Sequence, residues 1–141
     1  MKDLSKALKS MHGRSVEAGW FESAKYSDGT PVAAVAAWNE LGTPDANYPI
    51  PPRPFMRKAL MDANATIDQR LQRDVTRMLE GDFTPDQVLA RVGQHYVSSI
   101  VDSIKNGNWQ GNSDATIANK GFDKPLIHSG DMWKEATFNV T

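Results

Sequence analysis

The 141-residue sequence contains no cysteine, which excludes disulfide bonds, thiolate nucleophiles and zinc sites built on sulfur ligands. It has no excess of charge of either sign, because 16 Lys and Arg residues stand against 17 Asp and Glu residues. A chain with this balance is not a general electrostatic binder of nucleic acid. No segment approaches the roughly 18 consecutive apolar residues of a membrane span, so no membrane partner is expected. Residues 1–13 lack the apolar centre of a secretory signal, and we expect the chain to stay in the cytoplasm where it is made.

The sequence also lacks a recognisable catalytic or metal-binding motif. Its three histidines, His12, His95 and His128, are far apart, and there is no glycine-rich phosphate loop or nucleophile elbow. His95 is most simply interpreted as a half-buried core residue. His128 has Ser129 and Asp131 nearby, but neighbouring residues on a turn rarely point into one site. We therefore predict no catalytic residue, no metal site and no cofactor, and keep a hydrolase that uses His128 as an alternative.

The length is typical of a single domain, so residues 1–141 are expected to share one core. In the first third, the spacing of apolar residues predicts a short helix over 3–11, a strand within 15–23 and a small buried helix over 31–42. The last of these is rich in alanine and ends at Gly42, a natural C-terminal cap.

Two long amphipathic helices are predicted in the second half. The first starts at Pro54 and ends near Gly81. Its apolar positions recur every three or four residues: Met56, Leu60, Ala63, Ile67, Leu71, Val75 and Met78. The second covers residues 84–107, where Thr84 and Gln87 form the pattern of a capping box.

The C-terminal quarter reads as irregular chain followed by a strand. Glycine and asparagine are frequent after residue 107, a short helical turn is predicted over 114–121, and residues 133–140 alternate as in a strand. The predicted fold class is α+β. A small, mostly antiparallel sheet formed near residues 16–21 and 133–140 is packed by the two long helices.

A cluster of prolines predicts an extended arm over residues 43–53. Proline fixes the backbone in advance, so such an arm loses less entropy on docking than a flexible loop does. The predicted subunit contacts are Tyr48, Ile50, Pro51, Pro52, Pro54 and Phe55. The alternative is that the arm wraps its own helix pair, with Phe55 in the core.

Three cations surround the start of the first long helix. Arg53, Arg57 and Lys58 are spaced so that they could face phosphate groups of DNA. The alternative interpretation is ordinary solvated charge at a helix start.

Two separated blocks of the sequence carry a combined pattern. The first is a helix ending in N-E-x-G before an I-P-x-R-P-F segment, and the second is T-I-x-x-K-G-x-x-x-P-L-I-x-S-G-x-M before a last strand. The matching residues are Asn39, Glu40, Gly42, Ile50, Pro51, Arg53, Pro54 and Phe55 in the first block, and Thr116, Ile117, Lys120, Gly121, Pro125, Leu126, Ile127, Ser129, Gly130 and Met132 in the second. Together they resemble the neck or tail-completion proteins of tailed bacteriophages, which join a filled head to its tail. This family is structural and implies no catalytic residue.

The resemblance implies a virion protein of the phage neck, or collar, assembled in the host bacterial cytoplasm. Copies would form a closed homo-oligomeric ring around the channel for DNA, with six copies suggested by the tail axis and twelve by the portal side. A ring needs one patch that meets a different patch on the next copy, and the proline-rich arm and the alanine-rich helix offer such a pair.

The implied partners are other head–tail connector proteins, including those on the portal side and the tail terminator. DNA would be a transient, sequence-independent partner in the channel. The alternative function is that of an assembly factor or chaperone for tail completion that does not enter the virion.

Overall fold

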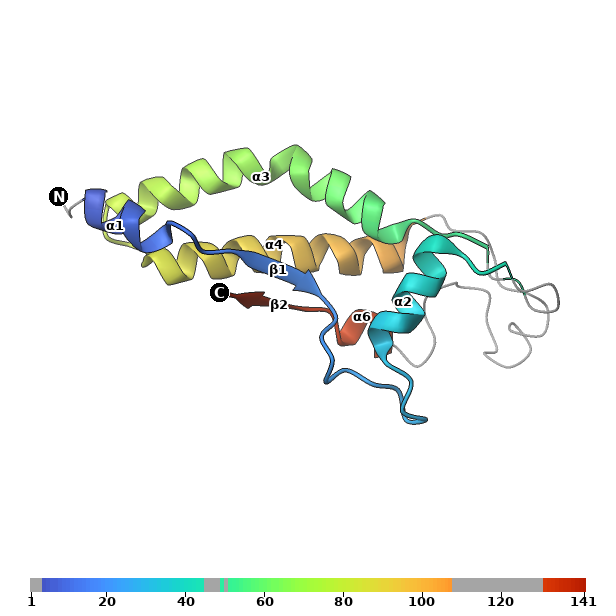
Figure 1. Ribbon diagram of the computed structural model, residues 1–141. Helices are drawn as coiled ribbons and strands as arrows, with labels where there is room; N and C mark the ends of the chain where they lie inside the picture. The colour runs from blue at the N-terminus through green and yellow to red at the C-terminus, as the bar shows by residue number, and fades with distance from the viewer. Residues whose placement is uncertain (1–3, 45–48, 50, 108–130) are drawn as a thin grey trace.

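The computed structural model describes residues 4–44, 49, 51–107 and 131–141. The elements are α1 (Leu4–Met11), β1 (Val16–Gly19), α2 (Val32–Leu41), α3 (Phe55–Leu79), α4 (Pro85–Asn106), α6 (Asp131–Lys134) and β2 (Thr137–Val140). Helices α3 and α4 form a long antiparallel pair, and the two strands lie along α4 (Figure 1). The α+β class with a small antiparallel sheet and two long helices is confirmed.

The boundaries of the helical pair follow from local sequence. The Thr84 hydroxyl accepts a hydrogen bond from the Gln87 backbone N–H at 3.1 Å, and the Gln87 side chain accepts one from the Thr84 N–H at 2.8 Å. These reciprocal bonds satisfy N–H groups that have no partner within the first turn of α4, as the capping-box pattern predicts. Beyond the end of α3, Gly81 adopts a φ of 90°, which strongly favours glycine.

Small side chains on α3 allow α4 to pack closely. Ala59 and Ala63 are buried in this interface. The half-buried His95 of α4 places its Nε2 atom 3.0 Å from the carbonyl oxygen of Ala63. Farther along the pair, the buried carboxylate of Asp74 accepts a hydrogen bond from Arg91 Nε at 2.9 Å. Polar bonds therefore fix the register of two helices whose apolar interface is narrow.

The sheet joins the beginning and the end of the described chain. Strands β1 and β2 are antiparallel, with Val16 opposite Val140, and both pack against α4. Phe138 of β2 lies directly over Gly93 of α4, where an added Cβ atom would come within 2.9 Å of the Phe138 Cβ. A glycine at this position therefore lets the strand approach the helix closely.

Both strands are shorter than the sequence predicts. Gly19 ends β1 with a φ of 148°, so Trp20 falls outside the strand. The indole N–H of Trp20 instead donates to the carbonyl oxygen of Met132 at 2.7 Å. At the other end, Trp133 belongs to α6, and β2 begins only at Thr137. The helical turn predicted over 114–121 lies outside the described residues.

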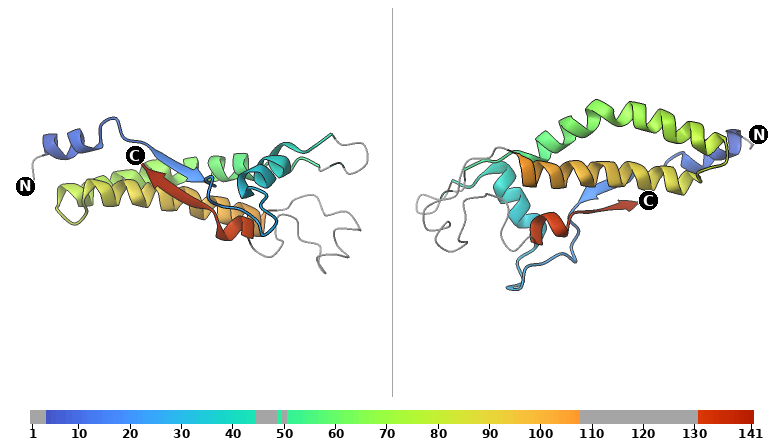
Figure 2. Two further views of the ribbon diagram at one scale, coloured as in Figure 1. Left: turned by 60° about the horizontal axis from the view of Figure 1, so that its bottom comes forward. Right: turned by 180° about the vertical axis from the view of Figure 1, so that it is seen from behind.

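The main core lies at one end of the helical pair, where α2 and α6 meet the start of α3 and the end of α4 (Figure 2). Its buried members are Val32, Ala36, Phe55, Ala59, Ile100, Ile104 and Met132. Helix α2 ends at Gly42, as the sequence predicts. It is only partly buried, however, because Trp38 and Leu41 are 46% and 71% exposed. Within the described residues, no helix combines the length and the apolar character that a membrane crossing requires.

Candidate subunit-contact site at the proline-rich arm

The arm is closed at its base by hydrogen bonds between Asn39 and Arg53. The Arg53 backbone N–H donates to the Asn39 carbonyl oxygen at 2.6 Å, and Arg53 Nη1 donates to Asn39 Oδ1 at 2.8 Å. The Asn39 amide in turn donates to the carbonyl oxygen of Val35 one helical turn earlier, at 2.9 Å. The end of α2 and the residue that leads into α3 are thus held together.

Glu40 caps the first turn of α3 from outside that helix. Pro54 precedes α3 and offers no side-chain acceptor, so the first N–H groups of the helix need other partners. Glu40 Oε2 accepts from the Met56 N–H at 2.8 Å, and Glu40 Oε1 accepts from the Arg57 N–H at 3.3 Å and from Arg57 Nε at 3.0 Å. A carboxylate is also favoured there by the positive end of the helix dipole.

This cap has a measurable consequence. We expect Glu40→Ala to lower the free energy of unfolding by about 1–2 kcal/mol, because the Met56 and Arg57 N–H groups lose their acceptor. Glu40→Gln keeps an acceptor without the charge, so its effect is expected to be smaller. Urea unfolding followed by circular dichroism measures both, and the exposed Glu22→Ala is the control. Equal stability of the Glu40→Ala and Glu22→Ala variants would contradict the capping role.

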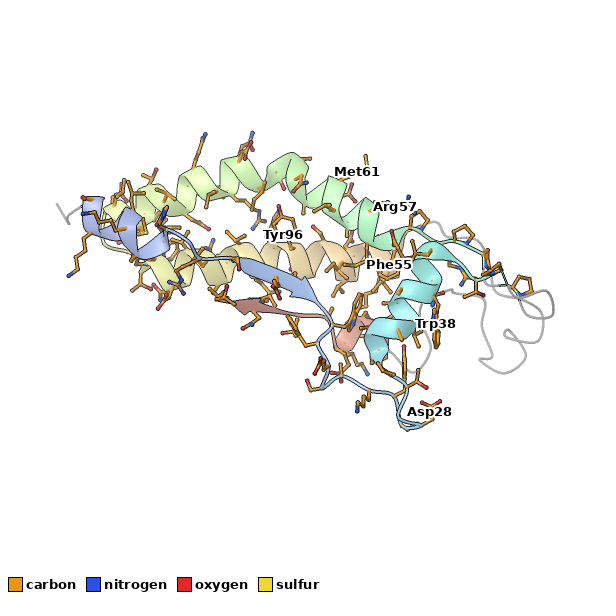
Figure 3. The ribbon with its side chains drawn as sticks, in the orientation of Figure 1. Asp28, Trp38, Phe55, Arg57, Met61 and Tyr96 are labelled. Atoms are coloured by element: carbon orange, nitrogen blue, oxygen red, sulfur yellow. The ribbon has the colours of Figure 1, made fainter. Side chains whose placement is uncertain are left out.

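Phe55, the first residue of α3, is a core residue of its own chain. Its side chain has no exposed surface and meets the Trp20 ring edge-on at a centroid distance of 5.9 Å. Its carbonyl oxygen accepts a hydrogen bond from the Ser103 hydroxyl at 2.8 Å. Figure 3 shows Phe55 where α2, α3 and α4 converge. The prediction that Phe55 contacts a neighbouring subunit is therefore corrected: Phe55 lies in the core of its own chain.

The remaining predicted contacts differ in their placement. Tyr48 and Ile50 lie outside the described residues. Pro52 is exposed, whereas Pro51 and Pro54 are half-buried. The described parts of the arm run beyond the end of the helical pair at which α3 begins (Figure 1).

The three predicted phosphate-facing cations separate into two groups. Arg53 is 6% exposed and bonded to Asn39, so it is a structural residue and cannot face DNA in this conformation. Arg57 and Lys58 are exposed. Lys58 Nζ donates to the Asp62 carboxylate at 2.6 Å, and this bond raises the pKa of Lys58 above its ordinary value. Each exposed cation is thus partly neutralised by a carboxylate.

The exposed apolar residues around the arm base are a feature that sequence periodicity missed. Trp38 and Leu41 lie on α2, while Leu60 and Met61 on α3 are 52% and 73% exposed. Leu60 was expected in the buried stripe of α3. The buried stripe instead runs through Ala59, so the pattern of large apolar residues is rotated relative to the actual interface. The adjacent pair of large apolar residues at 60 and 61 was the available signal, since both cannot face one partner helix.

The histidines show no catalytic grouping within the described residues. His12 is exposed, and His95 bonds to α3, with Thr66 Oγ1 3.2 Å from its Nε2 atom. His128 lies outside the described residues. Among the residues that the structure describes, no three His, Asp or Glu side chains are grouped so that they could hold a metal ion.

The contacts at the arm base join the two halves of the first sequence block, N-E-x-G and I-P-x-R-P-F. Comparison with known protein families, curated proteins and solved structures finds no match for this chain. Residues 116–130 of the second block lie outside the described residues. The geometry of the first block gives its polar residues a physical role, which is to hold the end of α2 against the start of α3.

Proposed function

We propose that the protein is a structural subunit of the neck of a tailed bacteriophage, where copies form a ring that joins the DNA-filled head to the tail. The observation that carries the proposal is the hydrogen-bonded arm base. Asn39 and Glu40 bond to Arg53 and to the start of α3, and so they anchor the base of the proline-rich arm. A proline-rich arm that is anchored at its base loses less entropy on docking, which suits it to bind a neighbouring subunit.

The chemistry of the arm end supports an assembly role. Trp38 and Leu41 expose apolar surface beside the arm base, and exposed aromatic and aliphatic residues tend to dominate protein interfaces. Because this surface of α2 lies at the same end as the arm, it extends the contact surface of the arm. The receiving patch on the next copy is then expected elsewhere on the molecule.

Contact with DNA in the channel is proposed to be weak. The near-neutral chain has a formal net charge of −1, and the exposed Arg57 and Lys58 are each paired with a carboxylate. Sparse contacts of this kind are directed at phosphates, do not depend on sequence and allow the duplex to slide.

Two measurements on one preparation test the proposal. An immunoblot of purified particles is expected to detect the protein in a fixed number of copies, and native mass spectrometry of the purified chain is expected to show monomers or weak oligomers. Spontaneous rings would consume subunits away from the head. A protein present in infected cells but missing from particles would favour the assembly-factor alternative, and a tight ring without partners would contradict assembly on the head.

A further inference from the structure

An open apolar groove lies between β1, α3 and α4. Its volume is about 480 Å³, and its walls include Val16 and Ala18 from β1, Met56 and Leu60 from α3, and Val92 and Tyr96 from α4. Among the described residues of the lining, Arg57 is the charged one. A groove of this size and composition on a small helical body is typical of a binding surface.

The groove is held in shape by bonds outside it. The Tyr96 hydroxyl donates to Asn64 Oδ1 at 2.6 Å, which fixes the orientation of an aromatic ring in the groove wall. At the other side, the Glu40 carboxylate fixes the Arg57 guanidinium. The groove therefore needs little rearrangement to accept a ligand.

We infer that this groove receives the proline-rich arm of a second copy of the chain. Residues 43–52 are apolar apart from short polar side chains, and Asp45 is their single charge. Pro49 and Pro52 have the P-x-x-P spacing of extended segments that dock into apolar grooves lined with aromatic residues. Asp45, the single charged residue of the arm, is opposite in charge to Arg57 of the groove, whose side chain stays exposed beside its bond to Glu40.

The anchored base of the arm favours a contact between copies. Asn39 and Arg53 fix the base of the arm, and the described trace on either side of the base runs beyond the end of the helical pair in every view (Figures 1 and 2). An arm on one copy and a groove on the next form a head-to-tail contact, which closes into a ring when the rotation per copy allows. This inference rests on the proposed function and names the receiving surface of the arm within the ring.

Cysteine pairing tests the inference, because the natural chain has no thiol. One preparation carries Pro52→Cys on the arm and a second carries Leu60→Cys in the groove. The control carries Met61→Cys, the next residue on α3, which is more exposed and is not part of the groove lining. After mixing at high concentration under mild oxidation, the Pro52→Cys and Leu60→Cys proteins are expected to form a disulfide-linked dimer several-fold faster than the Pro52→Cys and Met61→Cys proteins. Thermal melts establish that each variant is folded.

The double variant Pro52→Cys/Leu60→Cys is then expected to give a ladder of oligomers beyond the dimer on a non-reducing gel. Equal rates for the groove and control positions would overturn the inference, as would a double variant that forms only a disulfide within one chain. If the double variant gives a dimer and no larger oligomer, the contact is a two-fold symmetric dimer and the head-to-tail arrangement is wrong. The immunoblot of purified particles tests the proposed function independently of the crosslink. If the protein is present in virions but the crosslink does not form, the groove contact is refuted and the proposed function is not.

Discussion

Replacing Phe55 with alanine is expected to lower the free energy of unfolding of the isolated protein by about 3–5 kcal/mol. The side chain has no exposed surface, and its removal leaves a cavity beside Trp20, Ile100 and Ile104, which the fixed helices cannot fill. The hydrogen bond from Ser103 to the Phe55 carbonyl oxygen adds to the constraint on this turn. Guanidinium unfolding monitored by tryptophan fluorescence measures the change directly.

Met61→Ala is the matched control, because Met61 lies on the same helix and is 73% exposed. Its effect on the free energy of unfolding is expected to stay within about 0.5 kcal/mol. If the Phe55→Ala protein keeps the parental stability but fails to assemble, then Phe55 is a subunit-contact residue and not a core residue.

Replacing Ile50 with aspartate is expected to block incorporation into particles while leaving the melting temperature of the isolated subunit unchanged. The substitution places a charge where the proposed contact is desolvated, and one unpaired charge there outweighs the gain from the remaining apolar contacts. Ile50 itself lies outside the described residues. The base of the arm, however, is held by Asn39 and Arg53, so the core is expected to keep its packing.

Ile50→Leu, which keeps an apolar side chain, serves as the control and is expected to assemble. A fall of a few kcal/mol in the stability of the Ile50→Asp subunit would mean that the arm wraps its own chain. A normally melting Ile50→Asp protein that joins heads to tails at the parental yield would exclude the arm from the interface.

Features governed by neighbours in sequence could be predicted, as the cap of α4 illustrates. Thr84 and Gln87 are three residues apart, and the geometry of a helix start brings them together without help from the rest of the fold. The cap of α3 could not be found in this way, because its acceptor, Glu40, comes from another helix 16 residues before Met56. The strand predicted over 133–140 was too long because Trp133 takes part in α6, whose position depends on the core beneath it.

The same limit of sequence-based prediction applies to the candidate site. The cluster of prolines and the residue types at the arm base could be read from the sequence. Whether Arg53 and Phe55 face a partner or their own chain depends on the positions of α2 and α4. In the structure, both side chains are buried in their own chain. The groove beside Leu60 could not be foreseen, since its walls come from β1, α3 and α4 together.

The pairing of β1 with β2 also constrains the order in which the protein can fold during synthesis. Ser15 and Thr141, which bond beside the strands, are 126 residues apart in the chain. The helical pair can form while translation continues, because its contacts are close in sequence. β1 has no strand partner among the described residues until β2 leaves the ribosome, so its edge stays open for most of translation. The emergence of β2 therefore completes the sheet, and a nascent subunit cannot offer a finished groove before residues 137–140 have left the ribosome.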